Sequence, residues 1–357
     1  MKILIMAGGT GGHVFPALAV AHELRSQGHE VLWLGTRKGL EAEAVPRAGI
    51  NISFVAVSGL RGKHWLTWVF APYKLGIAFL QSLSLLWRLR PNVVLGMGGF
   101  VTGPAGFGAW LLDLPLVIHE QNAVAGATNR LLAPLADRVL EAFPGSLPAK
   151  YKPVHTGNPV RAEIARLPAP EERLRERDGA LRLLVLGGSL GAQALNETVP
   201  KCIRLLTQQQ RPEIWHQTGA RHIEAVQRIY QNAQVAARIV PFIDDMAAAY
   251  AWADVVLCRA GALTIAELAA AGVAALLVPY PHAVDDHQTH NARYLADAGA
   301  AVLIPQDKLT PAALCELLKE FTRVRTRLLS MAQAARARAL PDATAQVARA
   351  CLEVARG

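Results

Sequence analysis

The chain has 357 residues, of which 52% are hydrophobic and 18% charged, so it has the apolar content of a packed globular protein and not of a disordered one. Lys and Arg outnumber Asp and Glu by 37 to 28, and the net charge of +9 favours an anionic partner: a membrane surface, a nucleotide, a pyrophosphate or a nucleic acid. The four cysteines form no CxxC pair, which argues against a zinc ribbon or a disulfide framework and fits a reducing cytoplasm.

The N-terminal residues look at first like the start of a signal peptide. The apolar run 3–6 is very short, however, and leads directly into the glycine-rich residues 8–12, so we interpret it as a buried first strand. The longest apolar run without a charge in the first half, 75–87, is shorter than the roughly 20 residues that a bilayer-spanning helix needs. We therefore expect no transmembrane segment.

Short apolar runs alternate with helical patterns along the whole chain, and this alternation predicts parallel sheets covered by helices on both faces. The expected strands of the first half are 3–6, 31–34, 93–95 and 116–118, with a helix at 16–24. Those of the second half are 182–186, 214–216, 238–240, 255–258 and 275–278. The predicted fold class is therefore α/β, with two Rossmann-like doubly wound lobes.

The second half of the sequence repeats the opening of the first. Gly187-Gly188-Ser189 follows a strand as Gly8-Gly9-Thr10 does, which indicates a weak internal duplication. Between the lobes, Gly-Asn-Pro at 157–159 and the charge-rich stretch 167–178 are typical of a connection. We expect a first lobe of residues 1–160, a second lobe of 161–340 and a C-terminal helix, 341–357, that packs back on the first lobe.

Glycine loops between a strand and a helix bring backbone N–H groups and the positive end of a helix dipole to one point, where phosphates bind. Loops of this kind lie at 8–12, 96–104 and 187–191, although glycines also serve tight turns without any ligand. The first loop lacks the third glycine of a dinucleotide site, because Val14 stands there, and the second strand ends in Arg37 instead of an acidic residue. NAD is therefore disfavoured, and the absence of Gly-Lys-Ser/Thr in either lobe-opening loop disfavours ATP hydrolysis.

Two polar segments of the second half follow neighbouring strands. The segment 258–267 opens an Ala-rich helix, and its amides at Ala262, Leu263 and Thr264 would point at a diphosphate. An alternative is that Thr264 and Glu267 form only a capping box. The polar cluster 285–291 follows the next strand, and ligands bind at the carboxyl ends of parallel strands, so both segments are expected to meet in one crevice.

Eight motifs in this order resemble those of the MurG family. They are Gly8-Gly9-Thr10-Gly11-Gly12-His13, Gly96-Met97-Gly98-Gly99, His119-Glu120-Gln121-Asn122, Gly157-Asn158-Pro159-Val160-Arg161, Gly187-Gly188-Ser189, Phe242-Ile243-Asp244-Asp245-Met246, Arg259-x-Gly261-Ala262-Leu263-Thr264 and His287-Gln288-x-x-Asn291. The resemblance implies a GT-B fold with a cleft between its lobes. It also implies inverting transfer of GlcNAc from UDP-GlcNAc to the C4 hydroxyl of MurNAc in undecaprenyl-pyrophosphoryl-MurNAc-pentapeptide (lipid I), which forms lipid II.

The resemblance also assigns residues, with the donor bound mainly by the second lobe. Ile243 would contact uracil through its backbone, Glu267 would accept hydrogen bonds from the ribose, and Gln288 and Asn122 would read the sugar. Phe100 stands where some relatives carry Tyr, so no hydroxyl role is assigned there. The full donor set is Thr10, Gly11, Gly12, Asn122, Arg161, Ser189, Ile243, Ala262, Leu263, Thr264, Ile265, Ala266, Glu267 and Gln288.

Direct displacement needs a base for the acceptor hydroxyl. Our first candidate is His13, at the N-terminus of the first helix, where the dipole favours neutral imidazole; it could instead contact the acceptor pyrophosphate or cap the turn. His119 and Glu120 are the other candidates, unless they are a buried hydrogen-bonded pair. No Asp-x-Asp occurs and the 285–290 cluster is a weak metal candidate, so we expect no metal and no cofactor, with helix dipoles and Arg161 in that role.

The segment 61–80 places aromatic side chains among cationic ones. Such a segment suits the interface of an anionic membrane, although a core helix would have a similar composition. We expect peripheral, salt-sensitive binding at the cytoplasmic face of the inner membrane, close to the acceptor loop 98–103, and no binding of nucleic acid. The expected membrane residues are Trp65, Trp68, Phe70, Leu75 and Phe79.

Three activities remain open at this point. The first is the lipid-acceptor transferase, with lipid I or a different lipid as the acceptor. The second is a UDP-sugar epimerase on a similar two-lobed scaffold, which would need no lipid surface. The third is a UDP-sugar sensor without catalysis, for which the motifs at 96–104 and 119–122 would be needless.

Overall fold

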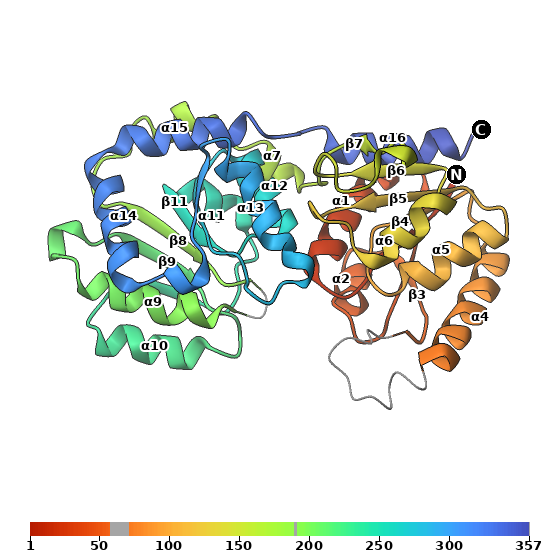
Figure 1. Ribbon diagram of the computed structural model, residues 1–357, viewed down its shortest axis with the longest axis horizontal. Coiled ribbons are helices and arrows are strands. Elements are labelled where there is room, and N and C mark those ends of the chain that lie inside the picture. Colours follow the sequence, from red (N-terminus) through yellow and green to blue (C-terminus); the bar gives the residue numbers. More distant parts are fainter. Residues whose placement is uncertain (58–70, 189–190, 357) are drawn as a thin grey trace. The chain divides into compact units, whose positions relative to one another are not determined.

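The computed structural model describes residues 1–57, 71–188 and 191–356 (Figure 1). The chain forms two compact units: unit 1 comprises Met1–Arg161 and Leu340–Gly357, and unit 2 comprises Ala162–Ala339. Each unit is a parallel sheet with helices on both faces. The α/β class and the two doubly wound sheets expected for a GT-B fold are therefore confirmed.

Unit 1 has a seven-stranded sheet in the order β3-β2-β1-β4-β5-β6-β7. Its strands are β1 (Lys2–Met6), β2 (Glu30–Gly35), β3 (Asn51–Phe54), β4 (Val93–Gly96), β5 (Leu116–Glu120), β6 (Arg138–Glu141) and β7 (Val154–His155). Its helices are α1 (Gly11–Ser26), α2 (Glu41–Arg47), α4 (Ala71–Leu89), α5 (Thr102–Leu111), α6 (Ala127–Leu132), the short η1 (Ala133–Leu135) and η2 (Ala149–Tyr151), and α16 (Ala343–Val354).

The strands of unit 1 are apolar on both sides because helices cover both faces of the sheet. Ile3 and Ile5 of β1 pack with α1, α2 and the C-terminal helix α16. Leu4 and Met6 point to the other face, where α4, α5 and α6 lie. The last helix of the chain thus belongs to the core of the first unit.

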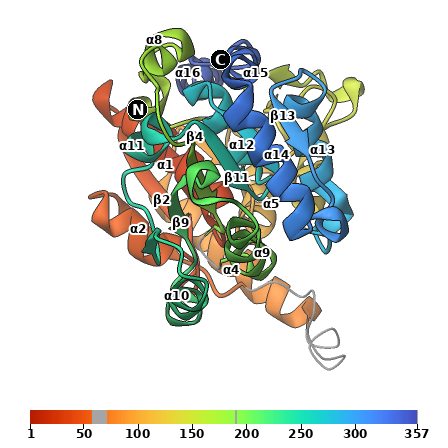
Figure 2. The same cartoon turned by 90° about the vertical axis from the view of Figure 1, so that its left-hand side faces the viewer.

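Unit 2 has a six-stranded sheet in the order β10-β9-β8-β11-β12-β13. Its strands are β8 (Arg182–Leu186), β9 (Glu213–Gln217), β10 (Arg238–Val240), β11 (Val255–Cys258), β12 (Ala274–Leu277) and β13 (Ala301–Leu303). Its helices are α7 (Ala162–Ala165), α8 (Pro170–Leu174), α9 (Gln193–Arg204), η3 (Gln208–Gln210), α10 (Ile223–Asn232), α11 (Met246–Trp252), α12 (Ala262–Ala271), η4 (Val284–Asp286), α13 (His287–Ala296), η5 (Gln306–Lys308), α14 (Pro311–Arg323) and α15 (Arg325–Arg336). Figures 1 and 2 show α9 and α10 on one side of this sheet and α12 and α13 on the other.

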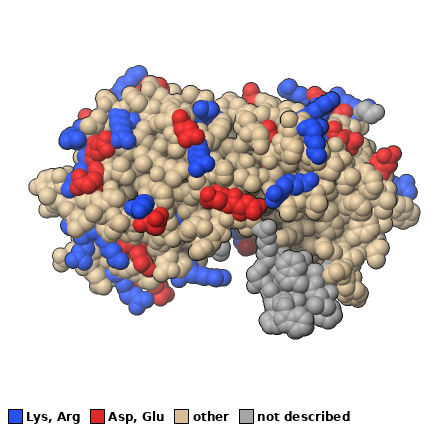
Figure 3. All heavy atoms as spheres, in the orientation of Figure 1, with Lys and Arg blue, Asp and Glu red and all other residues tan. Residues whose placement is uncertain are grey.

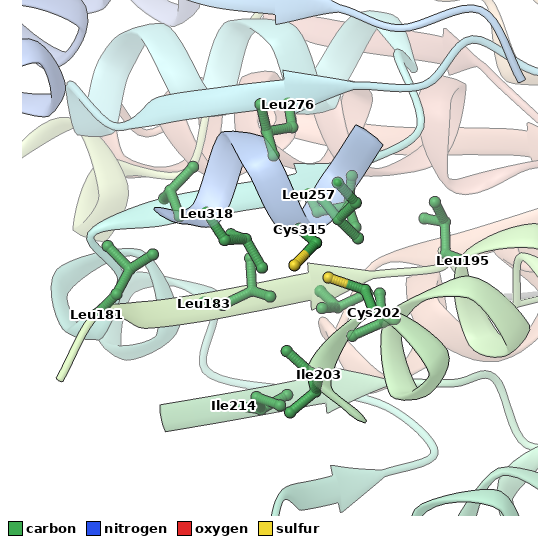
Figure 4. Packing of buried hydrophobic residues seen from close by; sticks show 14 of the residues in the cluster. Leu181, Leu183, Leu195, Cys202, Ile203, Ile214, Leu257, Leu276, Cys315 and Leu318 are labelled. Carbon is green, nitrogen blue, oxygen red and sulfur yellow. The ribbon is translucent and has the colours of Figure 1, made fainter. Parts of the chain in front are cut away.

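One apolar cluster of unit 2 contains the cysteines Cys202 and Cys315, shown in Figure 4. Cys202 of α9 and Cys315 of α14 pack with Leu183 and Leu257 of the sheet, and both thiols are free and buried. Burial raises the pKa of Cys202 to about 12, so its thiol stays protonated at neutral pH. These cysteines therefore act as small apolar core residues.

All nine strands expected from the sequence are present, three with the expected ends and the others with ends that differ by at most two residues. The sequence did not predict β3, β6, β7 and β13. Three of these lie at sheet edges, and β7 is only two exposed residues long, whereas β6 has the charged residues Arg138 and Glu141 at its ends. β3, β6 and β7 therefore lack the apolar run that identifies a buried strand, whereas β13 lies in the apolar run 300–304, which the sequence analysis missed.

Candidate active site

The first glycine loop joins β1 to α1. Thr10 is the N-cap of α1, and its carbonyl accepts the backbone N–H of His13 at 3.1 Å. Gly9 has φ +95°, a conformation that favours glycine. His13 is thus the third residue of α1, in the first turn, as expected, and its side chain is half-buried.

A buried carboxylate that the sequence analysis missed lies beneath this loop. Glu41, at the start of α2, is fully buried and accepts the backbone N–H of Gly9 at 2.9 Å. Its other oxygen accepts the N–H and the hydroxyl of Thr36 at 2.9 and 2.7 Å. A Cβ on Gly8 or Gly39 would lie within 2.6 Å of this carboxylate, so glycine at these positions permits its close approach. The Glu41 carboxylate therefore fixes the first loop through a hydrogen bond to the Gly9 amide, which leaves that amide unavailable to a ligand.

A chain of polar side chains runs from His13 into the core of unit 1. Nδ1 of His13 lies 3.0 Å from Oε1 of Gln121, and Nε2 of Gln121 lies 3.2 Å from Nδ1 of His119. Nε2 of His119 lies 2.9 Å from the carbonyl oxygen of Gly157. Burial lowers the pKa of His119 to about 4, since the backbone hydrogen bond only partly opposes it. His119 is therefore neutral at physiological pH.

His119 and Glu120 are the last two residues of β5 rather than residues that follow it. Each oxygen of the Glu120 carboxylate accepts two hydrogen bonds: Oε1 from the backbone and side-chain amides of Asn122, and Oε2 from Gly126 and Asn129. Both side chains are buried and their polar atoms are engaged. The geometry therefore favours a structural role for these two residues and leaves His13 as the candidate base.

The third glycine segment packs directly against the first loop. Gly98 and Gly99 have φ values of +87° and +86°, and a Cβ on Gly99 would lie 2.4 Å from the carbonyl oxygen of Gly8. A Cβ on Gly98 would lie 2.7 Å from Nδ1 of His13. The ends of β1, β4 and β5 thus bring the two loops and the His13–Gln121–His119 chain together.

In its described residues, the glycine loop of unit 2 is held by backbone groups and by the side-chain amide of Gln217, which donates to the carbonyl of Gly188 at 3.3 Å. Gly187 donates its N–H to the carbonyl of Gln217 at 3.1 Å, and Gly191 donates to Gly188 at 3.0 Å. A Cβ on Gly191 would lie 2.2 Å from the carbonyl oxygen of Thr218. Ser189, expected to contact the donor, lies outside the described residues.

Helix α12 starts at Ala262 with Gly261 as its N-cap. Thr264 is the third residue of the helix, so the alternative that Thr264 caps it is wrong. The amides in the first turn of a helix have no acceptor within that helix. Leu263 is the second residue of α12, so its amide has no acceptor within the helix. Glu267, one turn further on, is buried and accepts a hydrogen bond from the Tyr250 hydroxyl at 3.0 Å.

Side chains at the ends of β11 and β12 line a cavity of about 720 Å³ within unit 2. Gln288, in the first turn of α13, accepts the N–H of Tyr280 at 2.9 Å through Oε1. Arg259 donates to the carbonyls of Val278 and Pro279 and to Gln306, and burial lowers its pKa. The lining residues are Gly191, Ala192, Gln193, Ala194, Glu197, Arg259, Tyr280, His282, Gln288 and Gln306.

The remaining donor candidates are divided between the units. In unit 1, Gly12 is exposed and Gly11 half-buried in the first turn of α1, Asn122 is half-buried after β5, and Arg161 is half-buried at the end of the unit. In unit 2, Ile243 lies in the loop that joins β10 to α11. Its side chain is buried, so only its backbone could contact the donor. Ile265 is buried and Ala266 half-buried in α12. Their roles stay predictions.

Within the described part of the chain, no group of three or more His, Cys, Asp and Glu side chains could hold a metal ion. Asp285 and Asp286, the weak candidates, are exposed and have positive φ values. Metal-free catalysis remains a prediction.

Helices α4 and α5 of unit 1 carry an apolar surface, the α4–α5 surface, made of Leu75, Phe79, Leu80, Trp87, Phe107, Trp110 and Leu111. The ring of Phe107 lies 5.6 Å from that of Phe79 and 5.2 Å from that of Trp110. On the face that Figure 3 shows, few charged side chains lie in this part of unit 1. Leu75 and Phe79 were expected from the sequence, whereas Trp65, Trp68 and Phe70 lie outside the described residues. Among the described helices, none has the length and apolar character needed to cross a membrane.

Two family models match the chain. Residues 3–141 match the glycosyltransferase family 28 N-terminal domain, and residues 182–347 match the glycosyltransferase family 28 C-terminal domain. The first match lies within unit 1. The second lies within unit 2 except for residues 340–347, which belong to unit 1.

Curated relatives match over the full length. The chain is 57% identical to the UDP-N-acetylglucosamine--N-acetylmuramyl-(pentapeptide) pyrophosphoryl-undecaprenol N-acetylglucosamine transferase of Nitrosococcus oceani, over 100% of this chain and 99% of that protein. It is 54% identical to the transferase of the same name from Marinobacter nauticus, over 100% of this chain and 98% of that one.

Solved structures agree with this similarity. Acinetobacter baumannii MurG is 42% identical and superposes with a TM-score of 0.83 over 99% of both chains. A UDP-GlcNAc 2-epimerase from Neisseria meningitidis superposes with a TM-score of 0.68 over 99% of this chain and 100% of that one, at 13% identity. The second likeness extends to the fold alone.

Proposed function

The chain belongs to the MurG family within glycosyltransferase family 28, and from this membership we propose that it transfers GlcNAc from UDP-GlcNAc to the C4 hydroxyl of MurNAc in lipid I, forming lipid II. The observation that carries the proposal is the full-length similarity to transferases named for this reaction. The likeness to the epimerase is confined to the fold, so epimerisation is not favoured.

His13 of unit 1 acts as the base in this proposal. Its half-buried imidazole lies at the N-terminus of α1, where the dipole disfavours a positive charge. Direct displacement with inversion breaks the acceptor O–H bond as its oxygen attacks the anomeric carbon and UDP leaves with the bonding electrons. A base in hydrogen-bond reach of that hydroxyl lowers the barrier by removing the proton.

Unit 2 binds the donor in this proposal. The first-turn amides of α12 and the dipole of that helix favour a diphosphate, and charge on the departing UDP is stabilised in the same way. The Glu267 carboxylate, held by Tyr250, accepts the ribose hydroxyls. Gln288 presents its amide N–H groups to the sugar, because Oε1 already accepts the Tyr280 amide. The family resemblance also assigns Arg161, the last residue of the first segment of unit 1, a contact with the donor, and its positive charge would replace a metal ion.

A transfer assay tests the activity. With radiolabelled UDP-GlcNAc and the full chain, label should enter the lipid fraction only when lipid I is present. Conversion of UDP-GlcNAc without lipid I would support the epimerase, and donor binding with neither reaction would support a sensor. Exhaustive chelation should leave most of the transfer intact. Loss of transfer that one specific ion restores would contradict metal-free catalysis.

The α4–α5 surface is proposed to hold the enzyme at the cytoplasmic face of the inner membrane as a peripheral protein. Four of its large apolar side chains are about half exposed or more, with Trp87 at 66% and Leu80 at 64%. Lys74 and Arg88 are exposed on the same helix. Apolar side chains beside cations suit an anionic lipid surface, where each cation contributes ~1 kcal/mol.

Sedimentation with anionic liposomes tests this surface. Replacing Trp87 and Trp110 by Ser should reduce the bound fraction several-fold, because both aromatic side chains are exposed on it. Leu205→Ser is the matched control, since Leu205 is an exposed apolar residue of unit 2. Binding by the folded double variant equal to that of the control would exclude this surface as the anchor.

A further inference from the structure

We infer that Gln121 is a positioning residue that sets the tautomer of His13, so that the proton lies on Nδ1 and the lone pair on Nε2 of His13 receives the acceptor proton. The inference rests on the proposed function, in which His13 is the base. It follows from four polar groups in a row: the carbonyl of Gly157, His119, Gln121 and His13.

The buried end of the row, at the Gly157 carbonyl, determines which group donates and which accepts in each hydrogen bond. A backbone carbonyl only accepts, so Nε2 of His119, 2.9 Å from the Gly157 oxygen, must carry a proton. His119 is neutral at physiological pH because burial lowers its pKa to about 4. A neutral imidazole has one N–H, so Nδ1 of His119 is an acceptor.

The acceptor at Nδ1 of His119 in turn determines the orientation of the Gln121 amide. Its nitrogen lies 3.2 Å from Nδ1 of His119 and 3.2 Å from the carbonyl oxygen of the same residue, so it faces two acceptors. Turning the amide over would place its oxygen against both acceptors. The nitrogen therefore points to His119 and Oε1 points to His13, at 3.0 Å from Nδ1.

The outer end of the row is His13. Since Oε1 of Gln121 only accepts, Nδ1 of His13 donates, and a neutral His13 has its lone pair on Nε2. Among the described residues, none makes a hydrogen bond to that Nε2. The position of one buried carbonyl thus determines which nitrogen of His13 is basic.

The reaction uses the pair without moving any proton along the row. The acceptor O–H bond breaks, its proton bonds to Nε2 of His13, and the oxygen electrons form a bond to the anomeric carbon while the bond from that carbon to UDP breaks and UDP leaves with its electrons. Nδ1–H of the resulting imidazolium remains hydrogen-bonded to Oε1 of Gln121. A triad carboxylate orients a neutral imidazole in the same way and then stabilises the imidazolium with its negative charge, whereas an amide orients the imidazole without that charge.

Glycine at position 98 leaves room for the hydrogen bond between His13 and Gln121. A Cβ there would lie 2.7 Å from Nδ1 of His13 and 3.3 Å from Oε1 of Gln121, so the backbone of Gly98 closes over this hydrogen bond. The other charged groups near the loops, Glu41 and Glu120, are engaged by their own amide and hydroxyl donors. His119 and His13 are the titratable members of the row.

The tautomer can be observed directly. Nitrogen-15 NMR of the histidine-labelled full chain at neutral pH should show His13 protonated at Nδ1 and unprotonated at Nε2, assigned by comparison with His13→Gln. In Gln121→Met, which keeps the length of the side chain but removes both hydrogen-bonding groups, the two tautomers should mix. A wild-type His13 protonated at Nε2 would overturn the inference, whether or not the enzyme transfers GlcNAc.

Activity supplies the second readout. Gln121→Met should lower kcat on lipid I about 10²-fold with the donor KM within about twofold, because a misprotonated base affects only the chemical step. Gln27→Met, on the exposed end of α1, is the control. Wild-type kcat in folded Gln121→Met would refute the positioning role. Near-normal turnover in His13→Ala would instead refute the proposed base while the NMR result stands.

Discussion

The two units open in the same way, with a strand, a glycine loop and a helix, yet their loops are supported by different groups. In unit 1 the buried Glu41 carboxylate holds the amide of Gly9, and His13 follows at the start of α1. In unit 2 backbone carbonyls of Gln217 and Gly188 hold Gly187 and Gly191.

This difference separates two kinds of chemistry. The negative charge of Glu41 opposes an anion bound at the unit 1 loop, whereas the described residues of the unit 2 loop are held by neutral backbone groups and the Gln217 amide. The only histidine in either of these helix starts is His13. We therefore expect loss of the chemical step from changes in the unit 1 site and loss of donor binding from changes in the unit 2 site.

The largest expected effect is on turnover. His13→Ala should lower kcat on lipid I by about 10²–10⁴-fold, the usual contribution of a general base, at saturating donor. The exposed His22 on the same helix gives the control His22→Ala. Turnover of the His13 variant close to that of the control would remove His13 from the mechanism.

Glu41→Ala should lower the free energy of unfolding of unit 1 by about 2–3 kcal/mol, because the amides of Gly9 and Thr36 and the Thr36 hydroxyl lose their acceptor. Glu43→Ala, an exposed position in the same helix, should change it by less than about 0.5 kcal/mol. Denaturant unfolding of both variants measures this difference. Equal small losses would mean that the carboxylate does not support the loop.

Acidification should weaken both units through buried neutral histidines. Burial lowers the pKa of His119 in unit 1 to about 4 and that of His216 in unit 2 to about 3. The unfolded chain binds protons at these sites near pH 6.5, so stability is retained above that pH and falls as the pH drops toward the folded values. Each site would cost up to about 3–5 kcal/mol.

Unfolding at pH 7 and pH 5 tests this linkage. His216 contacts Tyr230 and Asn196, and His216→Gln removes the titrating group while it keeps polar atoms in the site. The variant should lose less stability between the two pH values than the wild type does. An unchanged pH dependence would show that His216 is already protonated or exposed in the folded state.

Glu267→Ala should weaken UDP-GlcNAc binding by ~1.5–3 kcal/mol, because the ribose loses a charged acceptor. Tyr250→Phe removes only the hydroxyl that holds this carboxylate and should cost about 1 kcal/mol. Calorimetric titration of the donor compares the two variants. Unchanged donor affinity with lowered thermal stability in Glu267→Ala would assign Glu267 a structural role.

The sequence predicted what depends on neighbouring residues. Apolar runs located the strands, and the glycines after β1, β4 and β8 located the loops. The sequence also placed Glu267 one turn inside α12, although it left open a cap at Thr264 that the helix start at Ala262 excludes. Local patterns therefore gave the fold and the position of most site residues.

What the sequence did not predict depends on contacts between distant segments. Glu41 reaches Gly9, 32 residues away, and Gln121 reaches His13 across 108 residues. His119 and Glu120 were candidate bases because their residue types suit that chemistry, and only their burial and their hydrogen-bond partners argue against it. Burial and partners of a side chain are tertiary properties that no local pattern encodes.

The most direct test of the division between the units is donor affinity measured in parallel on two full-length variants. Calorimetric titration with UDP-GlcNAc should give His13→Ala an affinity within about twofold of the wild type and Glu267→Ala an affinity at least about tenfold weaker. Equal losses in both variants, or a greater loss in His13→Ala, would contradict the account.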